Sequence, residues 1–270
     1  LPPSSGFNSG YINAGYIKNS GLELSASYDL IQGEDFNLRA GGNFTRQWSE
    51  VEELAQGQDI QVIGEAGGVV TAARMNRPVG MIMGTAFARN EDGLKIIDDD
   101  NLPRIATTEE GALDYEQVIG NSFPKFLWGG NIRMAYKGLQ MNVSLDAKAG
   151  HDIYSLTNKR GAEYGTWGYT EEGRDAWEKA KEISEITGVP PDDGYMVHGV
   201  KDGEEGKYPV DPQKYWDRLG RIHEAFVYDA SYIRLKQVSL TYNFDVSGMQ
   251  KLPFRKLSLS VYGDNLYYLM

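Results

Sequence analysis

The segment from Leu139 to Ala149 alternates between apolar and polar residues without an exception. Its odd-numbered positions are all apolar, and its even-numbered positions are Gln140, Asn142, Ser144, Asp146 and Lys148. Because successive side chains of a β-strand point to opposite faces, the pattern predicts a strand with one apolar and one polar face. Such a strand must place one side of its sheet against apolar surroundings and the other in water.

Other segments repeat this alternation and pair into hairpins. We expect strands at about 11–31, 36–48, 126–137, 139–153, 228–245 and 255–268. Short turns at Gln32–Asp35 and Lys137-Gly138 close the first two hairpins, and connections at about 49–125 and 154–227 separate the three. Short turns on one side of a sheet and long loops on the other are typical of a transmembrane antiparallel β-barrel. We therefore expect an all-β fold of this class, with the long loops outside the cell and the apolar side chains of each strand facing lipid.

A soluble β-sandwich also alternates and is the competing interpretation. Connections much longer than about 15 residues are uncommon in compact domains, which counts against the sandwich. Aromatic residues also gather at both ends of the predicted strands. Phe36 and Phe44 are eight residues apart, which at a tilt of about 40° is a rise of roughly 20 Å, close to the apolar band of outer-membrane barrels. The full set is Phe36, Tyr136, Tyr242 and Phe244 beside the short turns, and Phe44, Trp48, Phe126 and Trp128 at the far ends.

The composition narrows the class further. No run of 18 apolar residues is present, so no transmembrane helix is expected, and there is no cysteine for disulfides or thiolate chemistry. Since the smallest barrels have about eight strands, six cannot close one. We expect the C-terminal part of a larger barrel domain, without its plug domain, final strands or signal peptide.

The net charge of −11 is concentrated in the two connections. Residues 46–125 and 150–231 carry 31 acidic and 17 basic side chains, whereas the remainder carries 7 acidic and 10 basic. This argues against nucleic acid as a partner, because nucleic-acid binding requires a basic surface. Solvated loops explain the acidity, and attraction for cations or a basic partner is the alternative.

Within the loops we expect one helix, at about 170–187. Thr170 is the predicted N-cap and Gly188 the predicted stop, with Ala176, Trp177, Ala180 and Ile183 on one packed face. Tyr164, Trp167 and Tyr169 cluster with glycines just before it. We interpret these three aromatic residues as candidate substrate or partner contacts, the alternative being a small core of the loop itself.

No pattern in the sequence predicts catalysis, a cofactor or a metal site. His151, His198 and His223 are far apart and lack zinc-ligand spacing, and no nucleophile-elbow, P-loop or dinucleotide motif is present. Asp98–Asn101 lacks the ligand order of a calcium loop and predicts a polar turn. At Arg234-Leu235-Lys236 the apolar phase shifts by one residue, which predicts a β-bulge or the end of the membrane span.

Four motifs resemble signatures of the SusC/RagA family of TonB-dependent outer-membrane transporters. They are Asn13–Leu24 (NAGYIKNSGLEL), Ile119–Phe126 (IGNSFPKF), Tyr228–Leu240 (YDASYIRLKQVSL) and Gly263–Leu266 (GDNL), in the family's order. The resemblance implies a plugged barrel of about 22 strands in the outer membrane of a Gram-negative bacterium, in contact with lipid and lipopolysaccharide. It also implies import of oligosaccharides or peptides, energised by TonB, with a SusD-like surface lipoprotein as partner.

The resemblance does not identify substrate residues, because the motifs lie at strand starts and in the barrel wall. The sequence also lacks a TonB box. A passive porin or a surface adhesin would share the same wall pattern, and a sugar-active enzyme built on a β-sandwich is the third possibility. We expect no enzyme activity.

Overall fold

The computed structural model describes residues 6, 15–55, 57–246 and 256–269 and divides the chain into two compact units. We call residues 16–52, 123–152 and 229–270 the strand unit, and residues 1–15, 53–122 and 153–228 the loop unit. Among the described residues, no helix is both long enough and apolar enough to cross a membrane.

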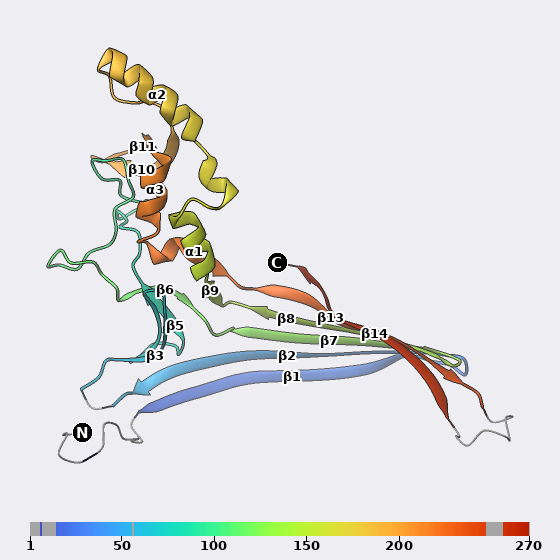
Figure 1. Ribbon diagram of the computed structural model, residues 1–270. Helices are drawn as coiled ribbons and strands as arrows, with labels where there is room; N and C mark the ends of the chain where they lie inside the picture. The colour runs from blue at the N-terminus through green and yellow to red at the C-terminus, as the bar shows by residue number, and fades with distance from the viewer. Residues whose placement is uncertain (1–5, 7–14, 56, 247–255, 270) are drawn as a thin grey trace. The chain divides into compact units, whose positions relative to one another are not determined.

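The strand unit is a six-stranded sheet in which neighbours in sequence are neighbours in space (Figure 1). Three strands differ from the predicted ranges by several residues: β2 ends later, β8 ends earlier and β13 begins later. Residues 11–14 and 255 of the predicted strands lie outside the described residues. The strands are β1 (Tyr16–Gln32), β2 (Phe36–Glu53), β7 (Phe126–Tyr136), β8 (Leu139–Ala149), β13 (Tyr232–Phe244) and β14 (Leu257–Leu269).

Cross-strand register keeps like residues in rows across the sheet. One apolar row runs through Leu38, Met134, Met141, Leu240 and Val261. The adjacent polar row, at Arg39, Arg133, Asn142, Ser239 and Tyr262, is tied by side-chain hydrogen bonds. Arg133 Nε donates to Asn142 Oδ1 at 3.0 Å, and Asn142 Nδ2 donates to Ser239 Oγ at 3.3 Å. The alternation of the sequence is therefore an alternation of whole sheet faces.

A bulge in β13 explains the phase shift in the sequence. Leu235 pairs with Leu145 and Gln237 with Ser144, so Lys236 is an extra residue with no partner on β8. On the other side, β14 places two residues, Asn265 and Leu266, opposite Lys236. The register shift returns apolar side chains to the apolar face on both sides of the bulge.

Family-motif residues hold this bulge together. Arg234 forms a two-pronged ion pair with Asp146, at 2.7 Å and 2.9 Å, and donates to Asn265 Oδ1 at 2.9 Å. Asn265 has a positive φ of 53°, a conformation that asparagine adopts more readily than most residues. The Leu266 side chain covers Gly263, where a Cβ would lie 2.8 Å from it. The motif therefore describes a strand irregularity, not a ligand site.

The sheet begins at β1 and ends at β14, so the described strands form an open sheet. A closed barrel, and a count of about 22 strands, remain predictions.

The loop unit contains a four-stranded sheet within the first long connection. Its order is β3 (Ile60–Ala66), β4 (Val69–Arg74), β5 (Met81–Gly84) and β6 (Gln117–Asn121), around buried Ala72, Met81 and Met83. The strand pairs join residues up to about 40 positions apart, as in Met81 opposite Asn121. Ser122 closes this sheet by donating from its backbone to the carbonyl of Gly80 at 2.8 Å.

The remainder of the loop unit is a small helical core (Figure 1). Its buried centre includes Phe87, Ile97, Trp216, Ile222 and Phe226. The elements are β9 (Asp152–Tyr154), α1 (Leu156–Glu163), the 3-10 segment η2 (Gly168–Glu171), α2 (Arg174–Thr187), β10 (Tyr195–Lys201), β11 (Glu204–Val210), α3 (Pro212–Leu219), the 3-10 segment η3 (His223–Phe226) and β12 (Val227–Asp229).

The predicted helix at 170–187 is correct at its end and wrong at its start. Gly188 has a φ of 72° and its N–H bonds to the carbonyl of Ser184, as a C-terminal glycine does. Thr170, however, belongs to η2, and Gly173 precedes the helix with a φ of 81°. The predicted packed face is also shorter than expected, because Ala180 is buried but Ile183 is 58% exposed.

Candidate functional site

Three helical segments of the loop unit enclose a cavity of about 450 Å³. The end of α1, the start of α2 and the start of α3 form its walls. Three of its lining residues are aromatic, three are carboxylates, and Arg174 and Gln213 add hydrogen-bond donors. The named side chains are Glu163, Tyr164, Arg174, Trp177, Glu178, Asp211, Gln213 and Trp216.

Local sequence fixes the positions of these walls. Ser155 caps α1 by accepting from the backbone of Asn158, and Asp211 caps α3 by accepting from the backbone of Gln213 at 2.9 Å. Pro212 occupies the first turn of α3, where a missing N–H is tolerated. Arg174 anchors the start of α2 by donating to the carbonyl of Thr170 at 3.0 Å. The cavity therefore lies between the C-terminal end of α1, the start of α2 that Arg174 anchors, and the start of α3 that Asp211 caps.

Aromatic packing holds one wall residue of the cavity, Trp216, in place. Trp216 contacts Tyr215, Tyr195 and Tyr169 with ring centroids 5.0, 5.6 and 5.1 Å apart. Its indole Nε1 is buried and has no hydrogen-bond partner among the described residues. Burial, with Tyr195 beside it, raises the pKa of Tyr215 and keeps this phenol neutral.

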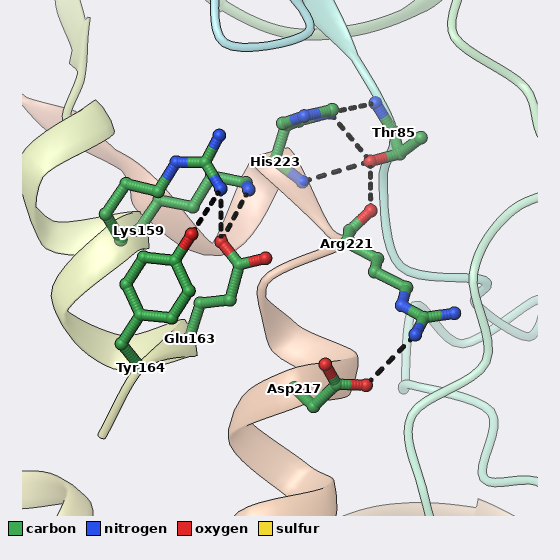
Figure 2. A network of polar contacts seen from close by, with 8 residues as sticks. Thr85, Lys159, Glu163, Tyr164, Asp217, Arg221 and His223 are labelled. Carbon is green, nitrogen blue, oxygen red and sulfur yellow. Dashed lines mark hydrogen bonds and ion pairs between the residues drawn. The ribbon is translucent and has the colours of Figure 1, made fainter.

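Glu163, which lines the cavity, is the centre of an ion network (Figure 2). Glu163 accepts from Lys159 at 3.2 Å and from Arg160 at 2.9 Å. Burial raises the pKa of Glu163, but the hydrogen bonds and charges of Lys159 and Arg160 outweigh it and hold the pKa below its usual value. Glu163 is therefore ionised at neutral pH.

A second network joins Thr85, just after β5, to η3 (Figure 2). Thr85 donates from its backbone to His223 Nδ1 at 3.2 Å, and its hydroxyl donates to the carbonyl of Arg221 at 2.6 Å. The same hydroxyl accepts from the backbone of His223 at 3.1 Å. Burial, and then the charge of Lys159, lower the pKa of His223, so its imidazole is neutral. This histidine is a structural link between two parts of the loop unit.

The three predicted contact residues do not form one cluster. Tyr164 lines the cavity and is 68% exposed, whereas Trp167 packs on Gly161 and Tyr169 packs on Trp216. None of the ring contacts among the described residues joins two of the three. Trp167 and Tyr169 thus contribute to the loop's own packing, and Tyr164 alone faces the cavity. Whether any of them contacts a substrate stays a prediction.

Sequence reasoning did not single out most of the cavity. Trp216, Asp211 and Gln213 lie about 50 residues from Tyr164 in the chain, and no local period connects them. The one local pattern that points to this wall of the cavity is the Asp-Pro pair at 211–212, which is typical of the start of a helix.

The arrangement suits binding more than catalysis. His151, His198 and His223 lie in different surroundings, and His198 pairs with exposed Glu205 at 3.1 Å. Within the described ranges, no group of three histidine, aspartate or glutamate side chains could hold a metal. Asp98 forms the predicted polar turn, because its carboxylate accepts from the backbones of Asp100 and Leu102.

Comparison with known proteins agrees with these features. No protein-family model matches the chain. Two receptors of Formosa agariphila, TonB-dependent receptor P3 and TonB-dependent receptor P26, are 25% and 23% identical to it, each across 98% of the chain and 26% of the receptor. The chain thus spans about a quarter of the length of the curated relatives it matches.

Solved structures show the same fold. The RagAB peptide transporter matches with a TM-score of 0.58 and 20% identity, covering 100% of this chain and 28% of the matched one. The RagAB peptide importer in its closed-closed state matches with a TM-score of 0.60 and 18% identity, and in its open-open state with 0.60 and 19%. These matches cover 100% of this chain and 28% and 27% of the matched chains.

The curated relatives are TonB-dependent receptors, and the chain is similar to them along 98% of its length. This similarity agrees with the resemblance to the SusC/RagA family that the four motifs carry. These relatives are receptors and transporters, not enzymes.

Proposed function

We propose that this chain forms wall and surface loops of a TonB-energised importer that takes up oligosaccharides or peptides. The observation that carries the proposal is the match to TonB-dependent receptors along 98% of the chain, combined with a sheet of unbroken apolar and polar rows. A passive porin or a surface adhesin is the alternative. It would have the same apolar and polar rows, but the curated relatives are TonB-dependent receptors.

The exposed apolar face of the strand unit supports a lipid-facing wall. Leu24, Leu145, Leu240, Leu259 and Val261 all expose large apolar side chains. A protein surrounded by water rarely exposes so continuous an apolar surface. In a bilayer, lipid chains cover this apolar surface. The polar rows on the opposite face then line the interior of a barrel that further strands close.

The acidic loop unit supports a position outside the cell. Its own buried core makes it a folded surface element, whereas the turns at Gln32–Asp35 and Lys137-Gly138 are short, as periplasmic turns are. An epitope inserted at Gly203, which has open space around it, should label on intact cells, and one at Gly33 should not. The reverse result would invert the topology.

The cavity supports contact with an incoming nutrient. Its volume is within the range of roughly 300–1,000 Å³ of small-ligand sites, and its mixture of rings, carboxylates and donors suits a polar ligand with an apolar face. Tyr164 is the ligand contact we propose there, and Tyr169 acts only indirectly, through its packing on Trp216 in the cavity wall.

Exposed apolar residues at the C-terminal end of α2 support docking of a SusD-like lipoprotein. Ile183, Ile186 and Val189 are 58%, 85% and 61% exposed, and large apolar side chains are favoured in interface cores. Ile186→Asp should therefore reduce co-purification of a surface lipoprotein, whereas Lys181→Asp on the same helix should not. Equal co-purification with both variants would place the partner elsewhere.

Uptake by cells with and without TonB is the deciding experiment. We expect uptake of the cognate nutrient to require TonB, to fall in Tyr164→Ala and to persist in Tyr115→Ala, a half-exposed tyrosine outside this cavity. Competition with unlabelled oligosaccharides or peptides identifies the substrate class. Uptake that continues without TonB would replace the importer with the porin.

A further inference from the structure

Arg46 in β2 is a cation on the apolar side of the sheet. In β2, Phe44, Arg46 and Trp48 stand at alternate positions, so the three side chains point to the same face of the sheet. The residue paired with Arg46 on β7 is Phe126. The apolar rows described above lie on this face, whereas Arg39 in the same strand points to the polar face. A guanidinium in this position needs a physical explanation.

Aromatic rings surround Arg46. Its Cζ lies 4.6 Å from the ring centroid of Trp48 and 5.3 Å from that of Phe126. Phe126 in turn stacks with Phe44 and Trp128, at centroid distances of 6.2 and 5.8 Å. The rings attract the cation through their π-faces and form a plate at the strand ends that lead into the long connections.

No carboxylate in the described part of the chain lies within ion-pair distance of Arg46. Other cations of the sheet have one: Arg39 lies 3.8 Å from Asp29, Arg234 contacts Asp146, and Lys18 pairs with Glu52 at 3.3 Å. Arg46 is exposed, and within the described part of the chain its guanidinium donates no hydrogen bond, so its donors can bind an external anion.

The membrane supplies one kind of anion at this depth. Aromatic belts of membrane barrels lie at the boundary between acyl chains and headgroups, where phosphates are concentrated. The planar fork of arginine matches phosphate with two parallel hydrogen bonds. We infer that Arg46, with Trp48 and Phe126, binds the phosphate of a lipid headgroup. With the loops outside, that lipid is the lipid A part of lipopolysaccharide. This inference rests on the lipid-facing assignment in the proposed function.

The test is lipid binding by the receptor purified in detergent, measured as the rise in melting temperature with added lipid. Diphosphoryl lipid A, dephosphorylated lipid A and phosphatidylglycerol are the probes. We expect Arg46→Gln to weaken binding of diphosphoryl lipid A by about tenfold or more, and Arg46→Lys, which keeps the charge but loses the fork, to weaken it less. Arg39→Gln on the polar face should bind like the unaltered receptor.

The outcomes separate the possibilities. Equal binding by Arg46→Gln and the unaltered receptor, or equal binding of lipid A with and without phosphate, would overturn the site. If Arg46→Gln weakened the binding of phosphatidylglycerol but not that of lipid A, the phosphate site would stand, but lipid A as the source of the phosphate would be overturned. TonB-dependent uptake, measured separately, should be unchanged in Arg46→Gln, so failure of the lipid site and failure of the importer are distinguishable.

Discussion

The strand unit and the loop unit are stabilised in different ways. Among the described residues, the buried apolar side chains belong to the loop unit except for Val51, Ala147 and Val246. The strand unit instead exposes its apolar rows on one face. The loop unit is ordered by its own core, whereas the strand unit depends on its surroundings for apolar contact. Under the proposed function, one chain buries apolar side chains in two ways: the loop unit buries them in its own core, and the strand unit places them against lipid.

Removing core volume from the loop unit should give the largest effect. Ile222 is fully buried between α3 and η3, and Ile222→Ala should destabilise the loop unit by about 2–5 kcal/mol. Limited proteolysis and hydrogen exchange should show opening at 153–228 while the six-stranded sheet stays protected. Simultaneous opening of the strand unit would show that the two units do not fold independently.

A charge on the apolar face of the strand unit should be nearly as costly. Val143→Arg near the middle of β8 should destabilise the inserted protein by roughly 2–4 kcal/mol, whereas Ser144→Arg on the polar face should have much less effect. Folding of both variants into lipid vesicles, followed against urea, measures the difference. Equal tolerance would contradict a lipid-facing apolar parity.

Two glycines that flank α2 offer a smaller, matched test inside the loop unit. Both have positive φ, but a Cβ on Gly173 would lie 2.6 Å from the backbone nitrogen of Tyr195, whereas one on Gly188 would meet open space. Gly188→Ala should cost about 1 kcal/mol from backbone strain alone, and Gly173→Ala more, because β10 must also move. Thermal unfolding of the loop unit should rank them in that order, and the opposite ranking would contradict the packing of α2 on β10.

The smallest expected effect is a pH dependence confined to the loop unit. Because the pKa of His223 is lowered in the folded state, its neutral form stabilises the fold above its unfolded pKa of about 6.5, and this contribution is lost as pH falls below that value. Proteolysis of the loop unit should therefore accelerate between pH 7.5 and 5. In His223→Gln the unit should be weaker but less dependent on pH, and in His198→Gln the dependence should remain. Equal pH dependence in all three proteins would exclude His223 as its source.

Local patterns predicted the strand unit far better than the loop unit. A period of two is visible within each strand, and the shift at Arg234-Leu235-Lys236 was readable as a bulge. The sheet of β3–β6 was not readable, because its strands have four to seven residues and β5 pairs with a strand more than 30 residues later. The cavity was hidden for the same reason, since Tyr164 and Trp216 meet only after three helices have packed.

The bulge at Lys236 has a consequence for how this wall tolerates changes in length. Losing or gaining one residue in a regular strand exchanges every side chain beyond that point between the apolar and polar faces. Losing or gaining two residues keeps every side chain on its original face, so the length of a regular strand can change only by an even number of residues. Opposite Lys236, where Asn265 and Leu266 already break the pairing, the sheet absorbs an odd residue without that exchange. Insertion scanning along β13 should thus find single-residue insertions best tolerated at this one point in the strand.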